Sequence, residues 1–339
     1  METRKLQAVG GGTFTVSLPK EWANNNGFRV GMELHLYTHR DGSILIRSSE
    51  MDVDRLDEAR VDVDGGGTEA VRRAVRTAHK SGFESITLRP TGSFSEAERK
   101  AARSTVRNLV GANILSESEA EITIRHLLDT AAVSIRQSVV QLQYSVVPLL
   151  GDATDVFVDG RDTHERVRDR ADEARRSAEM VTRHFSRSLV SYAELDALDT
   201  SRPELFTYYT IASCLETVAD QTVRIAATGG KLPEPLSDEA ATDVRSVADD
   251  VADAVDDAVT AVLSGDMATV QQARGRCDDA METIETVEKR LYDGDVTESV
   301  PAAVALANTL SGLRRAADCG HSLADTAAMS VVRKENLER

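Results

Sequence analysis

The sequence ELFTYYTIASCLETVADQTVRIAATGG, residues 204–230, carries a helical pattern and a clear stop signal together. At about 100° per residue, apolar and small residues recur on one stripe, which predicts a helix packed against partner helices. The stripe consists of Ile211, Leu215, Val218, Thr222 and Ile225. The glycines Gly229 and Gly230 then predict the end of the helix. We therefore take this helix as the centre of a larger helical assembly.

Two carboxylates, Glu216 and Asp220, lie one turn apart beside a second strip of small residues rather than on the open polar face. Like charges at this spacing cost a few tenths of a kcal/mol on an exposed helix, and more when they lose water. The pair therefore predicts a neighbouring cation. The alternative is a solvated acidic edge, which is common on exposed helices of acidic proteins.

The letters ASCLETVADQTVRIAATG, residues 212–229, resemble the signature helix of the PhoU family of phosphate-uptake regulators. The resemblance implies a pair of pseudo-repeated three-helix bundles. It also implies Glu/Asp-x-x-x-Asp motifs that hold metal ions on the bundle surface. The match is strong over this one helix and looser elsewhere.

The helical pattern continues from residue 129 to near the end of the chain, with helices expected at 129–150, 164–191, 204–228, 237–263, 266–292 and 299–333. The first is expected to break near Pro148 and Gly151, and LPEPLSD at 232–238 reads as a linker. A shift of 98 residues aligns LETVADQTVRIAATG with LRRAADCGHSLADTA. The sequence therefore predicts two pseudo-repeated three-helix bundles, residues 128–230 and 231–339.

The two copies differ at the acidic motif, because the second has Arg314 where the first has Glu216. Carboxylate clusters suit Fe, Mn, Mg or Ca, with Zn as a further candidate. An intact metal site is expected from Glu216, Asp220, Asp169 and Glu173. A degraded site, in which Arg314 neutralises the neighbouring carboxylate, is expected from Asp318, Asp278 and Glu282. His321 is an additional candidate ligand, although a lone histidine on an Ala-rich helix is more often structural.

Residues 1–50 form a distinct unit with few large apolar side chains. Two short strands, 4–9 and 13–17, flank a triglycine, and a short helix follows at 19–25. Strands 32–38 and 43–47 then form a hairpin that turns at Asp41-Gly42. A unit this small cannot bury an adequate core alone. The sequence therefore predicts a homodimer through this unit.

The string GGGTFTVSLPKEWANNNGFRVGMELHLYTHRDGSILIR, residues 10–47, resembles the AbrB or SpoVT type of swapped-hairpin domain. The resemblance implies that two chains interlock strands and present basic residues to DNA. The candidate DNA contacts are Arg4, Lys5, Lys20 and Arg29. This unit has one more basic than acidic residue, whereas residues 128–339 have 22 basic and 38 acidic ones, so DNA phosphates are least repelled here. The alternative is a unit that only dimerises.

Residues 51–127 predict a small α/β spacer domain, with strands at 61–63, 85–89, 111–115 and 120–125 and helices at 68–80 and 95–108. Ser95 and Glu98 form a capping-box pattern at the start of the second helix. No chemistry is assigned to this domain.

Composition narrows the class of protein further. The aromatic content of 4% favours Ala- and Val-rich helix bundles, so the expected fold class is multidomain and mainly α, with a small swapped-hairpin β domain, a small α/β domain and the two bundles. A net charge of −16, with arginine far outnumbering lysine, resembles the surfaces of salt-adapted, archaeal-type proteins. No apolar run reaches the length of a membrane span or signal peptide, and the three cysteines lack C-x-x-C spacing, so we expect a cytoplasmic protein that does not insert into the membrane.

No motif of a hydrolase, zinc protease or P-loop enzyme is present, so no enzymatic activity is expected. The function implied by the two resemblances is a phosphate-responsive regulator of phosphate uptake that binds DNA and senses through a metal-binding bundle. The alternative is a dimeric adaptor that does not bind DNA and docks on a phosphate transporter or a sensor kinase.

Overall fold

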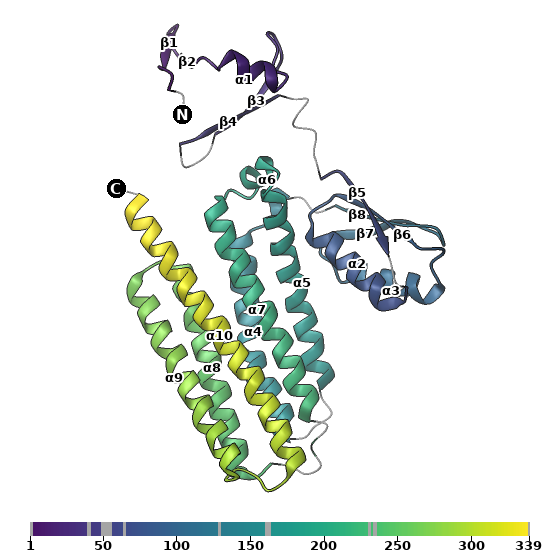
Figure 1. Ribbon diagram of the computed structural model, residues 1–339, viewed down its shortest axis with the longest axis vertical. Helices are drawn as coiled ribbons and strands as arrows, with labels where there is room; N and C mark the ends of the chain where they lie inside the picture. Colours follow the sequence, from purple (N-terminus) through teal and green to yellow (C-terminus); the bar gives the residue numbers. More distant parts are fainter. Residues whose placement is uncertain are drawn as a thin grey trace. The chain divides into compact units, whose positions relative to one another are not determined.

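The computed structural model describes residues 3–38, 42–48, 56–63, 66–127, 130–159, 164–229, 232 and 236–337. The chain divides into two compact units, Met1–Arg55 and Leu56–Arg339. Figure 1 shows the first unit in purple and the second from blue through green to yellow. The mainly α fold expected from the sequence is confirmed, with small strand pairs, a small sheet and long helices following one another along the chain.

The first unit, which we call the head, consists of two strand pairs and one short helix. Antiparallel β1 (Gln7–Val9) and β2 (Thr13–Thr15) pair on either side of the glycines, then α1 (Lys20–Asn25) precedes antiparallel β3 (Leu34–Thr38) and β4 (Ile44–Ser48). The predicted turn at Asp41-Gly42 lies partly outside the described residues. No hydrophobic side chain of the described head residues is buried. The head therefore has no core of its own.

The second unit begins with a four-stranded sheet in the order β5-β6-β8-β7, covered by two helices. Strands β5 (Glu58–Val63) and β6 (Ser85–Pro90) are parallel, joined through α2 (Thr68–Lys80); β7 (Ala112–Glu117) and β8 (Ile122–His126) follow α3 (Glu96–Arg107). The inward side chains Ile86, Leu88, Ile122 and Ile124 are essentially inaccessible. The predicted capping box is confirmed, since Ser95 and Glu98 bond each other's backbone N–H groups at the start of α3.

Six long helices make up most of the rest of the described chain. They are α4 (Ile135–Asp159), α5 (His164–Ser188), α7 (Arg202–Gly229), α8 (Asp238–Ser264), α9 (Met267–Asp293) and α10 (Val300–Leu337). A short turn, η1 (Thr130–Ala132), precedes α4, and a helix that was not predicted, α6 (Tyr192–Ala197), joins α5 to α7. Along the described residues, no helix is both long and apolar enough to cross a membrane.

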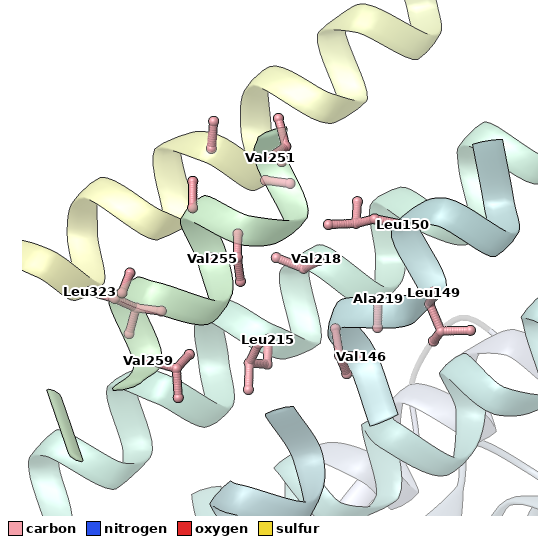
Figure 2. Packing of buried hydrophobic residues seen from close by; sticks show 14 of the residues in the cluster. Val146, Leu149, Leu150, Leu215, Val218, Ala219, Val251, Val255, Val259 and Leu323 are labelled. Atoms are coloured by element: carbon pink, nitrogen blue, oxygen red, sulfur yellow. The ribbon is translucent and has the colours of Figure 1, made fainter. Parts of the chain in front are cut away.

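The two three-helix repeats share one hydrophobic core rather than two separate ones. Figure 2 shows side chains of α4, α7, α8 and α10 meeting in it. The labelled residues are Val146, Leu149, Leu150, Leu215, Val218, Ala219, Val251, Val255, Val259 and Leu323. The stripe predicted on residues 204–228 is confirmed, because all five of its side chains are buried in α7. The helix with the acidic motif therefore lies at the centre of the assembly.

The expectation that the first long helix breaks near Pro148 and Gly151 is wrong, since α4 continues to Asp159. Proline removes one backbone hydrogen bond, the bond to the carbonyl four residues earlier. Pro148 and Tyr144 lie on the exposed face of α4, while Leu149 and Leu150 remain buried. Burial of the apolar face therefore outweighs the missing bond.

The glycine stop signal of α7 has a packing reason. A Cβ at Gly229 would lie 2.7 Å from the Phe157 Cα and 2.8 Å from the Val156 carbonyl oxygen of α4. These contacts are with backbone, which cannot rotate away, so only glycine fits where the end of α7 meets α4. Gly230, the other predicted stop residue, lies outside the described residues.

Candidate functional site

The four candidate DNA contacts of the head all have exposed side chains. Arg4 and Lys5 precede β1, Lys20 begins α1, and Arg29 follows α1 before β3. Exposure leaves these cationic groups accessible to a polyanion. The head therefore carries basic groups at its surface and, as shown above, no buried apolar residue among its described positions.

A cleft of about 830 Å³ lies between the α/β domain and the first helical repeat, lined by α2, α3, α5 and α7. Its charged lining consists of six cationic side chains, Arg72, Arg73, Arg76, Lys80, Arg168 and Arg175, and five carboxylates, Glu69, Asp172, Glu179, Glu216 and Asp220. The predicted pair on α7 thus faces a mixed-charge cleft rather than open solvent. We call this the interdomain cleft.

Lys80, at the end of α2, supplies the cation beside Glu216. Its Nζ donates to both carboxylate oxygens of Glu216, at 3.0 and 3.3 Å. The same ammonium lies 3.7 Å from Oε1 of Glu179, a carboxylate of α5 that is 3% exposed. Lys80 therefore joins the α/β domain to two helices of the bundle through one positive charge.

Glu179 is the most buried carboxylate of the cleft. Burial raises its pKa above the usual range, and the charges of Lys80 and Arg76 oppose that rise. The Arg76 guanidinium is 3.9 Å away, which is too long for a hydrogen bond. Sequence reasoning missed Glu179, although it lies next to Ala178 of the buried stripe of α5 and so at the edge of a packed face.

Asp220 is held by Arg175 of α5, whose guanidinium donates to Asp220 and also to Asp172. Burial lowers the pKa of Arg175, but the hydrogen bond from Arg175 to Asp220 and the charge of that carboxylate outweigh burial, and the net pKa is raised. Arg175 therefore remains fully charged. Each carboxylate of the predicted pair has a protein cation as its partner.

The structure does not bring Asp169 and Glu173 to this cluster, contrary to the expectation. Both are exposed and neither lines the interdomain cleft. At 3.6 residues per turn they point away from Ala171, Ala174 and Ala178, which face the core. The residues of α5 that reach the cleft are instead Arg168, Asp172, Arg175 and Glu179. The error was one of helix face, since one residue corresponds to a rotation of about 100°.

The second repeat also differs from its expected site. Arg314 donates to Glu288 at 2.7 Å and lies 3.6 Å from Glu285, so its partners are on α9, and no contact with Asp318 is among its ion pairs in the described chain. Asp278 lies 3.7 Å from the His321 imidazole. Asp318 and Glu282 are both exposed.

The fit to a metal ion follows from these contacts. No group of three or more His, Cys, Asp and Glu side chains within the described residues is arranged to hold one. Lys80 already pairs with Glu216, and Arg175 with Asp220. In this arrangement the residues of the cleft do not fit a metal centre.

Two buried arginines of α5 fix the α/β domain against the bundle and were not found from the sequence. Arg183 donates to the carbonyl oxygens of His79 and Phe83, both at 2.9 Å, and Arg187 donates to that of Gly82 at 2.7 Å. Carbonyls at the end of α2 lack helical partners and carry partial negative charge, which favours a cation there. These bonds set the position of Lys80, which follows His79 at the end of α2.

Two histidines are buried beside these arginines. The rings of His79 and His126 have centroids 4.8 Å apart, and no ring nitrogen of either has a hydrogen-bond partner within the described residues. Burial, followed by the positive charges nearby, lowers the pKa of His79 to about 2 and that of His126 to about 3. Both imidazoles are therefore neutral at physiological pH.

Residues 7–53 match the model of the family described as antidote-toxin recognition MazE, bacterial antitoxin. The fold is similar to the crystal structure of PhoU from Pseudomonas aeruginosa, with 16% sequence identity and a TM-score of 0.42, over 58% of this chain and 95% of that one. No curated protein matches the chain. The matched residues 7–53 include the whole strand-and-helix part of the head, so the N-terminal part of this chain is a MazE/AbrB-type domain.

Proposed function

We propose that the chain is a cytoplasmic, dimeric, DNA-binding regulator of phosphate uptake, whose helical part relays phosphate status to the head. The observation that carries the proposal is the MazE/AbrB-type head, because domains of this type typically dimerise and bind DNA. No catalytic step is part of the proposal.

Dimerisation is supported by the apolar surface of the head. Phe14, Leu36 and Ile44 are each more than 60% exposed, and no described head residue offers a buried apolar partner. Isolated two-stranded pairs are marginal in water. A second copy of the head would cover these side chains and complete a core that one chain lacks.

DNA binding is supported by charge. The exposed Arg4, Lys5, Lys20 and Arg29 belong to the least acidic part of a chain whose net charge is −16. The acidic helical part repels DNA, so phosphate contacts are favoured at the head.

The phosphate part of the proposal depends on the resemblance of residues 212–229 to the PhoU signature helix. The contacts around that helix provide a route for relay, since Glu216 binds Lys80 of the α/β domain that follows the head in the chain. A metal at Glu216 and Asp220 stays a prediction, and it would have to displace Lys80 and Arg175.

The proposal is tested by mapping genome-wide DNA occupancy of the tagged full chain in phosphate-replete and phosphate-starved cells. We expect occupancy at promoters of phosphate-transport genes that changes with phosphate supply. The adaptor alternative would instead give no enrichment on DNA and co-purification with a phosphate transporter or a sensor kinase. Occupancy that does not respond to phosphate would contradict the phosphate part alone.

A further inference from the structure

Helices α7 and α10, one from each repeat, pack against each other in opposite directions (Figure 1). Their register follows from the surroundings of Gly312 in α10. A Cβ added at Gly312 would lie 3.2 Å from the Ile225 side chain and 3.8 Å from the Gln221 amide oxygen. Residues seven apart lie on nearly the same face of a helix. Two turns forward from Gly312 and two turns back from Gln221 bring Cys319 opposite Cys214.

Cys214 and Cys319 are both free cysteines of intermediate exposure, and each shifts the pKa of the other, so their side chains interact. They belong to different repeats and lie 105 positions apart in the sequence. Small oxidants therefore have access to a pair of sulfur atoms that the fold has already brought together.

We propose that Cys214 and Cys319 form a redox-modification site, in which a peroxide converts the two thiols into a disulfide that links the first repeat to the second. The inference does not depend on DNA binding or on phosphate. The contact between Cys214 and Cys319 is not part of the sequence pattern or of the proposed function.

The interaction between the two thiols gives the two sulfur atoms different roles. The interaction with Cys319 lowers the pKa of Cys214, whereas the interaction with Cys214 and burial raise the pKa of Cys319. The thiolate is the nucleophile in thiol oxidation, so Cys214 is the residue that attacks peroxide. Cys319 keeps its proton until the second step.

The reaction balances with one peroxide for each pair of thiols. The Cys214 thiolate attacks one peroxide oxygen, the O–O bond breaks, and the departing hydroxide combines with the proton that Cys214 released, giving water and a sulfenic acid. The Cys319 sulfur then attacks the Cys214 sulfur, the S–O bond breaks, and the departing hydroxide takes the Cys319 proton. The two thiols lose two electrons, and peroxide is reduced to two waters.

Cys277 provides an internal control within the same protein. It is fully buried in α9, beside Gly320 of α10, where a Cβ would lie 2.9 Å from its sulfur. Burial raises the pKa of its thiol to about 12. Cys277 should therefore remain reduced while the other two cysteines react.

The test treats the purified, folded full chain with a small excess of hydrogen peroxide, blocks remaining thiols with an alkylating reagent under denaturing conditions, and maps disulfides by mass spectrometry. We expect one intrachain link between Cys214 and Cys319, alkylated Cys277, complete reversal by dithiothreitol, and a higher melting temperature for the oxidised form. Wild-type protein suffices for this map, so the test does not depend on a variant that folds.

Variants then separate the two roles. In Cys319→Ser a sulfenic acid should accumulate on Cys214 and be trapped by dimedone, whereas Cys277→Ser should leave the link unchanged. The proposal is overturned if peroxide gives no link between Cys214 and Cys319, if the link involves Cys277 or a second chain, or if dimedone labels Cys319 in preference to Cys214.

Discussion

Lys80 balances two carboxylates that come from different helices, one of them almost inaccessible to water. Removing a cation from buried carboxylates leaves charge without compensation, which costs more than the ion pair itself contributes. Through Lys80, a charge of the α/β domain stabilises two carboxylates of the bundle.

We therefore expect Lys80→Met to lower the free energy of unfolding by about 1 to 3 kcal/mol, discounted from the fully buried case because Lys80 is partly exposed. Chemical denaturation monitored by circular dichroism measures the change. The matched control is Arg72→Met on the same helix, whose pair with Glu69 is exposed and should contribute at most about 0.5 kcal/mol. Equal effects of the two changes would show that Lys80 has no special role.

The buried histidines make stability depend on pH. His79 and His126 stay neutral in the folded protein, whereas in the unfolded chain they titrate near 6.5, so only the unfolded state gains protons as pH falls below that value. Each histidine then lowers the free energy of unfolding by about 1.4 kcal/mol for each pH unit below 6.5. Between pH 6.5 and 5.5, we expect the free energy of unfolding to fall by about 2 to 3 kcal/mol because of this pair.

The measurement compares unfolding free energies at pH 7.5, 6.5 and 5.5 for the wild type and for His79→Phe. The variant should lose about half of the histidine-dependent change, whatever its absolute stability. An unchanged pH dependence in the variant would mean that His79 is protonated or exposed in the folded protein.

Helix starts are where local sequence determines structure most directly. The capping box of α3 is complete, and the Glu98 carboxylate also accepts the Gly67 N–H at 2.7 Å, which joins the turns that precede α3 and α2. We expect Ser95→Ala to destabilise the α/β domain by about 1 kcal/mol, and Ser95→Thr to retain most of the stability. Amide hydrogen exchange of α3 measures this locally, and equal protection in all three proteins would contradict the role of the cap.

Local patterns predicted the long helices after α4 to within a few residues and identified the buried stripe of α7, because periodicity and stop signals act within a few turns. They did not reveal that α4 passes Pro148, since that depends on what the following residues bury. They also placed the α5 carboxylates on the wrong face. The contacts of Glu216 with Lys80 and of Arg183 with His79 join distant parts of the chain, and no local pattern encodes such a pairing.

In the whole molecule, the head differs from everything that follows it. The helical unit has a continuous core, whereas the described head residues bury no apolar side chain. The stability of the head must therefore come from outside its own fold, and a second copy is the partner we propose.

We expect the full chain to sediment as a dimer at micromolar concentration, and Leu36→Asp to convert it to monomer by burying an uncompensated charge at the interface. Tyr292→Asp places the same charge at an apolar residue of α9 that is 80% exposed, and it should leave the dimer intact. A monomeric wild type, or dissociation by the α9 change alone, would contradict dimerisation through the head.

The most direct test of the account is the salt dependence of DNA binding by the full chain. Fluorescence anisotropy with a labelled duplex should give an affinity that falls linearly with salt on logarithmic axes, with a slope shallower by about one unit for each phosphate contact that Lys20→Ala or Arg29→Ala removes. Lys100→Ala, an exposed lysine of α3, should change neither affinity nor slope. If the wild type shows no duplex affinity even at low salt, or if Lys100→Ala weakens binding as much as the head variants do, the head is not a DNA-binding domain and the adaptor alternative stands.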